Sequence, residues 1–257
     1  MHSGSFNLQP MEISQYLDAT YLKTPLQAGL TDAENRGVVR NTVQEAIDNN
    51  FKLAMIRPDM VAMAKQMVVD AHSKVLIGTV IDFPDGTGSL TDKLAEAVQA
   101  IDNGADDLDF VVDYRAFRAG DITAVKQQVE ECTRLGLDAG KTVKWIIEIA
   151  ALNDHEIVQL TVLIKNVVLS HFEESSYGHV FVKSSTGFYK TEGGLPNGAT
   201  LPAIKLMLEN SFPLPVKAAG GVRDYNEAMQ MIQLGVKRIG TSAAKAIVNG
   251  QTTAGGY

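Results

Sequence analysis

The sequence His179-Val180-Phe181-Val182-Lys183-Ser184-Ser185-Thr186-Gly187 is an apolar run that ends in a lysine and continues into hydroxyl side chains and a glycine. A second segment of this kind is Pro215-Val216-Lys217-Ala218-Ala219-Gly220-Gly221-Val222-Arg223. Short apolar runs of this length are typical of buried strands in a parallel sheet. A lysine at the end of a buried strand costs free energy unless it is paired or used. Two of them on neighbouring strands therefore indicate an amine adapted to attack a carbonyl.

Similar runs alternate with helical patterns along the whole chain. The expected strands are Gln15–Thr20, Phe51–Ile56, Val75–Ile81, Asp107–Val112, Val143–Ile149, His179–Lys183, Leu214–Ala218 and Arg238–Gly240. The expected helices are Thr42–Asn49, Met60–Asp70, Ser89–Asn103, Ile122–Leu135, Asp154–Leu169, Leu201–Glu209 and Asn226–Leu234. Eight such units predict an α/β fold of the (β/α)8 TIM barrel type. A doubly wound open sheet is the alternative, but the first expected strand lacks its glycine-rich loop.

Length and composition limit the other classes of protein. The chain has 257 residues, 45% of them hydrophobic, and no Pro/Gly/Ser-rich linker, so we expect one domain over residues 1–257 with a flexible tail at about 250–257. The net charge of −7 argues against a nucleic-acid partner. No apolar run is long enough to span a membrane, and no signal peptide is recognisable, so we expect a cytoplasmic protein without a membrane partner. The single cysteine, Cys132, is expected to be a packed thiol.

Local signals suggest where several helices begin and end. Thr42 and Ser89 each precede a helical run with an acidic residue in its first turn, as N-cap residues do. Gly104 and Gly235 follow helical runs, where glycine commonly ends a helix.

The alternation of side chains along each expected strand places charged residues inside the barrel. Strand residues point alternately to the two faces, and the wholly apolar set should pack against the helices. The interior then receives Asp18, Asp109, Lys144, Glu148, Lys183 and Lys217. Buried charges must be paired or hydrated. For Lys144 and Glu148, an ion-pair network that only fills the barrel is an equal alternative.

Lys183 and Lys217 should lie at the carboxyl ends of adjacent strands, the face on which barrel enzymes carry their chemistry. Two ammonium groups held about 6 Å apart repel by about 2.8 kcal/mol at an effective dielectric of 20. This repulsion lowers the pKa of one lysine, and burial lowers it further, so that the lysine can form a Schiff base. A nearby carboxylate raises a lysine's pKa, so we expect the lysine farther from Asp109 to be the nucleophile. These considerations leave open which lysine that is.

Two glycine-containing loops follow the last two expected strands, at Gly220-Gly221 and at Gly240-Thr241-Ser242. Loops at these positions are the recurrent phosphate site of the barrel fold, because backbone N–H groups approach the anion there. Ser184-Ser185-Thr186-Gly187 adds hydroxyl and N–H donors. The five histidines are scattered without the spacing of metal ligands, so no metal site is expected.

The chain resembles the deoxyribose-phosphate aldolases, a family of class I aldolases with a (β/α)8 fold. The segments that carry the resemblance are Leu17–Leu22, Gly78–Pro84, Gly104–Asp109, Val143–Glu148, Val182–Phe188, Val216–Arg223 and Arg238–Ser242. They follow one another in family order over nearly the whole chain. The two lysine segments, Lys183-Ser184-Ser185-Thr186-Gly187 and Lys217-Ala218-Ala219-Gly220-Gly221-Val222-Arg223, are the most specific of them.

This resemblance implies reversible cleavage of 2-deoxy-D-ribose 5-phosphate to D-glyceraldehyde 3-phosphate and acetaldehyde. It implies that Lys183 forms the Schiff base, that Lys217 lowers its pKa, and that Asp109 positions a water or shuttles a proton. Asp18 and Lys144 would complete the polar network, and the terminal Tyr257 would be a proton shuttle, with a disordered tail as an equal alternative. The implied substrate and phosphate contacts are Thr20, Thr186, Gly187, Gly220, Gly221, Arg223, Gly240 and Ser242. No cofactor is expected, because the iminium itself accepts the electrons.

Two departures from the family pattern lie near this site. The segment from Phe188 to Gly198 is longer than in many members, and Lys190 within it could contact the substrate. Met55 occupies a strand position where some members carry cysteine. The expected partners are a phosphorylated sugar, an aldehyde and a second copy of the chain in a homodimer. Another Schiff-base aldolase or transaldolase, or a phosphosugar-binding barrel without turnover, remains an alternative.

Overall fold

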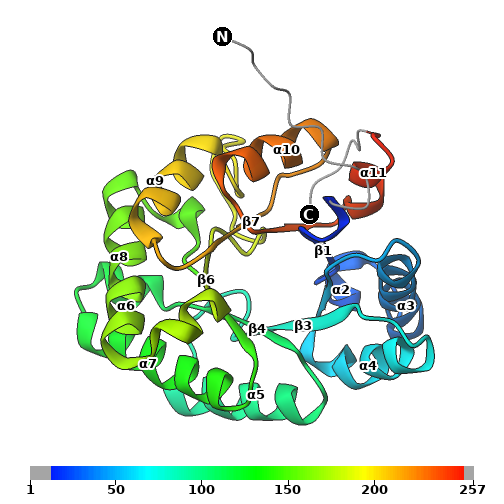
Figure 1. The fold of residues 1–257 in the computed structure, drawn as a ribbon, viewed down its shortest axis with the longest axis horizontal. Helices are drawn as coiled ribbons and strands as arrows, with labels where there is room; N and C mark the ends of the chain where they lie inside the picture. Colours follow the sequence, from blue (N-terminus) through cyan, green and yellow to red (C-terminus); the bar gives the residue numbers. More distant parts are fainter. Residues whose placement is uncertain (1–12, 252–257) are drawn as a thin grey trace.

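The computed structural model describes residues 13–251, in which eight parallel strands form a closed barrel in sequence order. Each strand pairs with the next, and β8 pairs with β1. The strands are β1 Leu17–Thr20, β2 Leu53–Ile56, β3 Leu76–Ile81, β4 Asp107–Val111, β5 Thr142–Ile146, β6 Val180–Lys183, β7 Val216–Ala219 and β8 Arg238–Thr241. Helices surround this ring of strands (Figure 1). The predicted (β/α)8 barrel is confirmed, whereas most of the expected flexible tail lies outside the described residues.

The helices follow the strands in alternation. They are α2 Pro25–Ala28, α3 Asp32–Asp48, α4 Val61–Asp70, α5 Leu90–Asp102, α6 Tyr114–Arg118, α7 Ile122–Asp138, α8 Asp154–His171, α9 Leu201–Ser211, α10 Tyr225–Leu234 and α11 Ala244–Val248. Within residues 13–251, three short 3-10 helices lie in the connections: η1 Pro58–Met60, η2 Ile149–Ala151 and η3 Glu174–His179.

Three of the four expected helix boundaries are confirmed, and the fourth is wrong. Ser89 accepts a hydrogen bond from the Asp92 amide at 3.2 Å, and Gly104 and Gly235 follow helices with φ of 97° and 113°. Thr42 lies inside α3, where its hydroxyl donates to the Val38 carbonyl. The helix begins ten residues earlier, after the N-cap Thr31, because Thr31 and Glu34 form a reciprocal capping box.

The outward strand faces pack against the helices as the alternation predicts. Trp145 of β5 is fully buried and stacks on Phe110 of β4 at 5.2 Å between ring centroids. Its indole N–H donates to the Thr133 hydroxyl of α7 at 2.9 Å, so the polar atom of this large side chain is satisfied. Burial of one such side chain contributes roughly 1.5–3 kcal/mol to folding. This packing fixes β5 and leaves the alternate residue, Lys144, inside the barrel.

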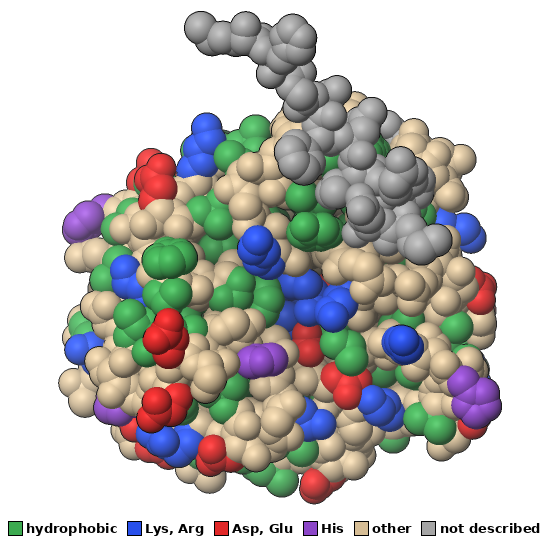
Figure 2. Space-filling model, in the orientation of Figure 1, with side chains coloured by type: hydrophobic (Ala, Val, Ile, Leu, Met, Phe, Trp, Pro, Cys, Tyr) green, Lys and Arg blue, Asp and Glu red, His purple; other side chains and the backbone are tan. Residues whose placement is uncertain are grey.

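The surface carries charge of both signs. Figure 2 shows Lys and Arg side chains among Asp and Glu side chains on the face that it draws. No helix of residues 13–251 is long and apolar enough to cross a membrane.

Candidate active site

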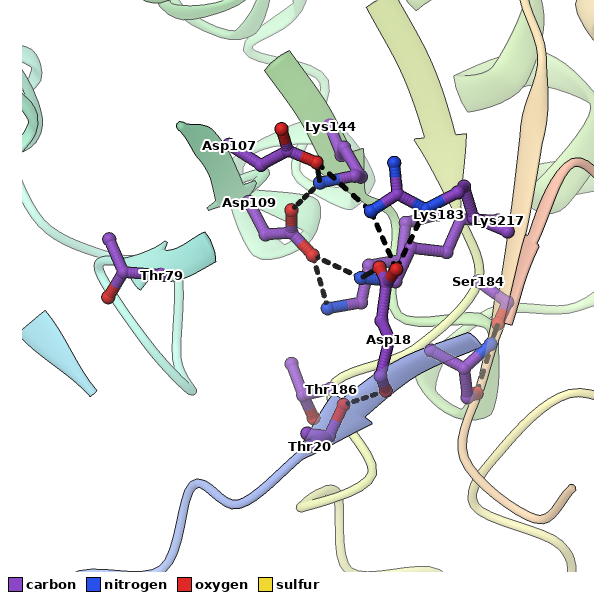
Figure 3. Close-up of polar contacts among 12 residues, drawn as sticks. Asp18, Thr20, Thr79, Asp107, Asp109, Lys144, Lys183, Ser184, Thr186 and Lys217 are labelled. Atoms are coloured by element: carbon purple, nitrogen blue, oxygen red, sulfur yellow. Dashed lines mark hydrogen bonds and ion pairs between the residues drawn. The ribbon is translucent and has the colours of Figure 1, made fainter. Parts of the chain in front are cut away.

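Seven charged side chains form a buried cluster inside the barrel (Figure 3). The cluster consists of Asp18, Asp107, Asp109, Lys144, Lys183, Lys217 and Arg238. Four cationic groups face three carboxylates, so the fully ionised cluster carries an excess of one positive charge. Because isolated charge is costly in a buried site, this excess favours loss of a proton from one of the amines.

Asp109 of β4 is the centre of the cluster. Its Oδ1 lies 2.7 Å from Nζ of Lys144, and its Oδ2 lies 2.8 Å from Lys183 and 2.9 Å from Lys217. Burial alone would raise the pKa of Asp109, but the three lysines outweigh burial and hold the pKa well below its usual value. Asp109 therefore remains a carboxylate over the neutral pH range.

Asp107 and Arg238 belong to the cluster but were missed from the sequence. Arg238 lies 2.6 Å from Asp18 and 3.2 Å from Asp107, which also contacts Lys144 at 2.7 Å. Asp107 shares a strand face with Asp109, two residues away, so the alternation could have placed it inside. Arg238 opens β8 in register with Lys217, and the same reasoning applied to β8 could have found it.

Lys183 and Lys217 are paired in register on β6 and β7. Burial is the largest cause that lowers the pKa of Lys183, and repulsion from Lys217 adds to it, so that the pKa falls to about 8 against the opposing effect of Asp109. Burial alone would also lower the pKa of Lys217, but Asp109 and Asp18 together raise it. The two neighbouring amines therefore differ in charge state at mildly alkaline pH.

The expected criterion for the nucleophile, distance from Asp109, does not separate the two lysines. Their Nζ atoms lie 2.8 and 2.9 Å from the same Asp109 oxygen. The difference comes from Asp18, whose Oδ2 lies 2.6 Å from Nζ of Lys217. Within residues 13–251, the one carboxylate that Lys183 contacts is Asp109.

Glu148 does not join the cluster, contrary to the expectation from alternation. β5 ends at Ile146, and Glu148 adopts a left-handed conformation with φ of 55°. Its Oε2 accepts hydrogen bonds from the hydroxyl and, at 3.1 Å, from the amide of Thr186. Burial raises the pKa of Glu148, although the Thr186 donors oppose this effect. Glu148 thus holds the loop that follows Lys183.

The other expected substrate threonine is also held by a hydrogen bond. The hydroxyl of Thr20 donates to the Asp18 carbonyl at 2.8 Å, and Figure 3 shows Thr20 and Thr186 on the same side of the lysines. A cavity of about 420 Å³ opens beside Thr186, and Glu148, Phe188, Tyr189 and Lys190 are among its lining residues.

The expected phosphate glycines separate into two groups. Gly187, Gly220 and Gly221 have φ of 80–81°, a conformation that glycine adopts at little cost. Gly220 also packs against Gly198 of the long loop, where a Cβ on Gly220 would lie 2.9 Å from the Gly198 Cα. Gly240, in contrast, lies inside β8, and a Cβ there would lie 3.1 Å from Cε of Lys217. Gly240 therefore provides room for Lys217.

The first turn of α10 is already capped by carboxylates. The Asp224 side chain accepts from the Glu227 amide at 2.9 Å, and Glu227 accepts from the Arg223 amide at 2.6 Å. Arg223 and Ser242 are exposed at this end of the barrel. An anion here would therefore use the glycine turn and these two side chains rather than the N-terminus of α10.

The remaining sequence predictions concern residues away from the cluster. Cys132 is buried in α7, and burial raises the pKa of its thiol to about 12, as expected for a packed thiol. Residues 13–251 contain no group of His, Cys, Asp or Glu that could hold a metal ion. Tyr257 lies outside the described residues.

Comparison with known proteins identifies the family. A model of the DeoC/LacD family aldolases matches residues 26–252, and the chain belongs to this family. The deoxyribose-phosphate aldolase of Thermococcus gammatolerans is 34% identical over 245 residues, which cover 95% of this chain and 98% of the relative. Deoxyribose-phosphate aldolase 1 of Staphylococcus aureus is 35% identical over 241 residues, which cover 93% and 97%.

Solved structures agree with this assignment. The structure of deoxyribose phosphate aldolase from Aeropyrum pernix, described as a unique tetramer, superposes with a TM-score of 0.76 at 26% identity. The match covers 94% of this chain and 91% of that one. The family resemblance found in the sequence motifs is confirmed.

Proposed function

We propose that this protein reversibly cleaves 2-deoxy-D-ribose 5-phosphate to D-glyceraldehyde 3-phosphate and acetaldehyde, with Lys183 as the Schiff-base lysine. The family membership and the names of its relatives support the reaction. The choice of Lys183 over Lys217 rests on the number of carboxylates that each lysine contacts. Lys183 shares Asp109 with two other lysines, whereas Lys217 also has Asp18. A lysine with a pKa of about 8 is roughly one-tenth neutral at pH 7 and about half neutral at pH 8.

In the cleavage direction the neutral Lys183 amine adds to C1 of the open-chain sugar, and loss of water gives an iminium. A base removes the proton of the C3 hydroxyl, the C2–C3 bond breaks, and its electron pair forms the enamine. D-Glyceraldehyde 3-phosphate leaves, C2 takes up a proton, and water hydrolyses the iminium to acetaldehyde and free Lys183. The iminium is the electron sink of this sequence.

The other members of the cluster have distinct roles in this proposal. Lys217 remains a cation and helps to keep Lys183 deprotonated, while Lys144 and Asp18 fix Asp109 and Lys217 in position. Asp109, with its low pKa, is a poor proton acceptor by itself. We therefore assign it to holding the water through which the proton moves, and Tyr257 to a second proton path.

The substrate phosphate lies at the carboxyl ends of β6, β7 and β8 in this proposal. The turns at Gly187 and Gly220-Gly221 supply amide donors, and Arg223 and Ser242 supply side chains. Thr20 ends β1 and Thr186 follows β6, and in this proposal both contact the sugar. Gly240 contributes indirectly, through the room that it leaves for Lys217.

Turnover is the direct test of the reaction. Purified protein is incubated with 2-deoxy-D-ribose 5-phosphate, and both products are quantified by coupled assay and by NMR. The reverse reaction is compared with acetaldehyde and with dihydroxyacetone phosphate as donors. Equal release of the two products, and addition from acetaldehyde only, are expected. Addition from dihydroxyacetone phosphate instead would favour another Schiff-base aldolase, and substrate binding without turnover would favour a binding protein.

We infer further that the chain is a single-domain cytoplasmic enzyme that forms a homodimer. The closed barrel supports the first point, and the tetrameric relative from Aeropyrum pernix supports self-association. Light scattering during size-exclusion chromatography measures the assembly, and a monomer at micromolar concentration would contradict the dimer.

A further inference from the structure

The barrel interior has a charged part, to which six strands contribute, and a smaller apolar part. The charged cluster comes from β1 and β4–β8, whereas β2 and β3 contribute apolar side chains. Leu22, Leu53, Met55 and Val80 form a hydrophobic cluster separate from the main core, and Phe83 and Phe188 pack against it. We use the name apolar wall for Leu22, Met55, Val80, Phe83 and Phe188.

The apolar wall borders the lysine site on two sides. Val80 of β3 is the register partner of Asp109, the carboxylate that contacts Lys183. Met55 of β2 is the register partner of Thr20. Because register partners on adjacent strands lie about 4.8 Å apart, Val80 and Met55 are first neighbours of these site residues.

The wall is tightly packed within the barrel. A Cβ on Gly78 would lie 2.6 Å from Cε of Met55, so the Met55 side chain fills the space that this glycine leaves. The side chains of Leu22, Met55 and Val80 are at most 1% exposed. A hydroxyl group placed against them loses its water and gains no partner from their carbon atoms.

Loop residues extend the wall toward the substrate side. Phe188 lies in the loop after Lys183, yet its ring packs edge-on against Phe83 of the loop after β3, at 5.1 Å between centroids. Arg57 joins these parts, because its side chain donates to the carbonyls of Leu22 and Phe83 and lies over the Phe83 ring. Arg57 therefore connects Leu22 with Phe83, and the contact between Phe83 and Phe188 connects the loop after β3 with the loop after Lys183.

We propose that the apolar wall determines the donor specificity of the Schiff-base site, with Val80 as the principal specificity-determining residue. This inference rests on the proposed function. In this proposal the enamine carbon next to the iminium carbon faces Val80, because Val80 is the register partner of Asp109, which contacts Lys183. A donor whose second carbon carries only hydrogen fits against Val80, whereas a hydroxylated donor must bury an unpaired hydroxyl. The site therefore selects donors that lack oxygen on that carbon, such as acetaldehyde over glycolaldehyde.

Apolar pockets reject an added hydroxyl by about 10²-fold. We therefore expect kcat/KM for addition to D-glyceraldehyde 3-phosphate to be about 10²-fold higher with acetaldehyde than with glycolaldehyde. In the glycolaldehyde reaction, the enamine carbon adds to the aldehyde carbon, and water then releases a pentose 5-phosphate from the lysine.

The test measures this ratio in three variants. Val80→Thr keeps the side-chain shape and supplies a hydroxyl partner, and it should reduce the preference for acetaldehyde about tenfold. Val80→Ala creates space without a polar group and should leave the ratio within about twofold. Val98→Thr is the matched control, because Val98 is 44% exposed on α5, and it should behave as the parent protein does.

An unchanged ratio in a folded, acetaldehyde-active Val80→Thr variant would overturn the inference. An equal shift in Val80→Ala would also overturn it, because space rather than polarity would then decide. If the parent protein shows no adduct with either aldehyde, the proposed function fails instead. Circular dichroism and borohydride trapping of acetaldehyde on each variant distinguish these results.

Discussion

Nζ of Lys217 lies 2.6 Å from Oδ2 of Asp18, and this contact separates two lysines that are otherwise placed alike. Both lysines donate to the same oxygen of Asp109 and are buried on adjacent strands. The second carboxylate raises the pKa of Lys217, while the pKa of Lys183 falls to about 8. One amine is thereby kept as a cation next to one that loses its proton easily.

The first prediction concerns the pH dependence of catalysis. Because the neutral amine attacks and the pKa of Lys183 is lowered to about 8, kcat/KM for deoxyribose 5-phosphate should rise with pH and level off above about 8. Steady-state rates measured between pH 5.5 and 9.5 give this ascending limb of the pH profile. A flat profile, or a limb near the ordinary lysine pKa of about 10.4, would contradict the assigned charge state.

The second prediction concerns Asp18→Asn. Loss of this carboxylate lowers the pKa of Lys217 and removes a partner from a buried pair, which typically costs about 3–5 kcal/mol. A partly neutral Lys217 repels Lys183 less, so the ascending limb of the pH profile should move to higher pH. Urea unfolding measures the stability loss. Asp32→Asn, at an exposed carboxylate in the first turn of α3, is the surface control and should leave the limb unmoved.

The third prediction concerns the stability cost of Lys183. Its folded-state pKa is about 8 and its reference value is 10.5, so the unfolded state binds more protons between these values. The cost of the buried ammonium, about 3 kcal/mol, is fully present below pH 8 and disappears as pH rises toward 10.5. Lys183→Met should therefore be inactive but more stable at pH 7, with the gain shrinking at alkaline pH. A variant less stable than the parent at pH 7 would argue against this account.

The fourth prediction concerns Gly240→Ala. The new Cβ would lie 3.1 Å from Cε and 3.8 Å from Nζ of Lys217, so the Lys217 side chain must shift by a few tenths of an ångström against its carboxylates. We expect kcat to fall at least tenfold, with an altered pH profile. Gly37→Ala is the matched control, because its Cβ meets nothing within 4 Å in α3 and should stabilise the protein by about 0.5–1 kcal/mol. Wild-type kinetics in Gly240→Ala would contradict the role of Gly240 in placing Lys217.

The fifth prediction concerns the loop after Lys183. Glu148→Ala removes the acceptor for both Thr186 donors, so KM for the phosphorylated substrate should rise about tenfold while acetaldehyde still forms an adduct. Glu148→Gln keeps an amide oxygen as acceptor and should restore most of the affinity. Equal KM values in the parent and Glu148→Ala would show that the loop needs no such anchor.

Much of the fold was predictable because the barrel repeats one pattern. All eight strands were found from apolar runs, and the alternation placed Asp18, Asp109, Lys144, Lys183 and Lys217 inside. The start of α3 was mistaken, because the strong capping box at Thr31 precedes a polar first turn with little apolar periodicity. Helix starts depend on such local hydrogen bonds more than on hydrophobic pattern.

Which of the two lysines has the lowered pKa, and how the loops contact one another, could not be predicted from the sequence. The choice between the lysines depends on Asp18, which is 199 residues away from Lys217 in sequence and contacts it inside the barrel, where β8 alone separates their strands. Glu148 was placed with the cluster because alternation was extended past the end of β5, where the backbone becomes left-handed. The contact between Phe188 and Phe83 depends on loop geometry that no periodicity encodes.

Borohydride trapping with acetaldehyde, followed by peptide mapping, tests the central claim most directly. The reduced adduct should add a two-carbon mass to Lys183 and vanish in Lys183→Ala. Lys93 is a built-in control, because it is equally buried but donates to two carbonyls and pairs with Asp82. The account predicts modification of Lys183 and none of Lys93 or Lys217. A protein that turns over substrate with its adduct on Lys217, or with no adduct at all, would contradict it.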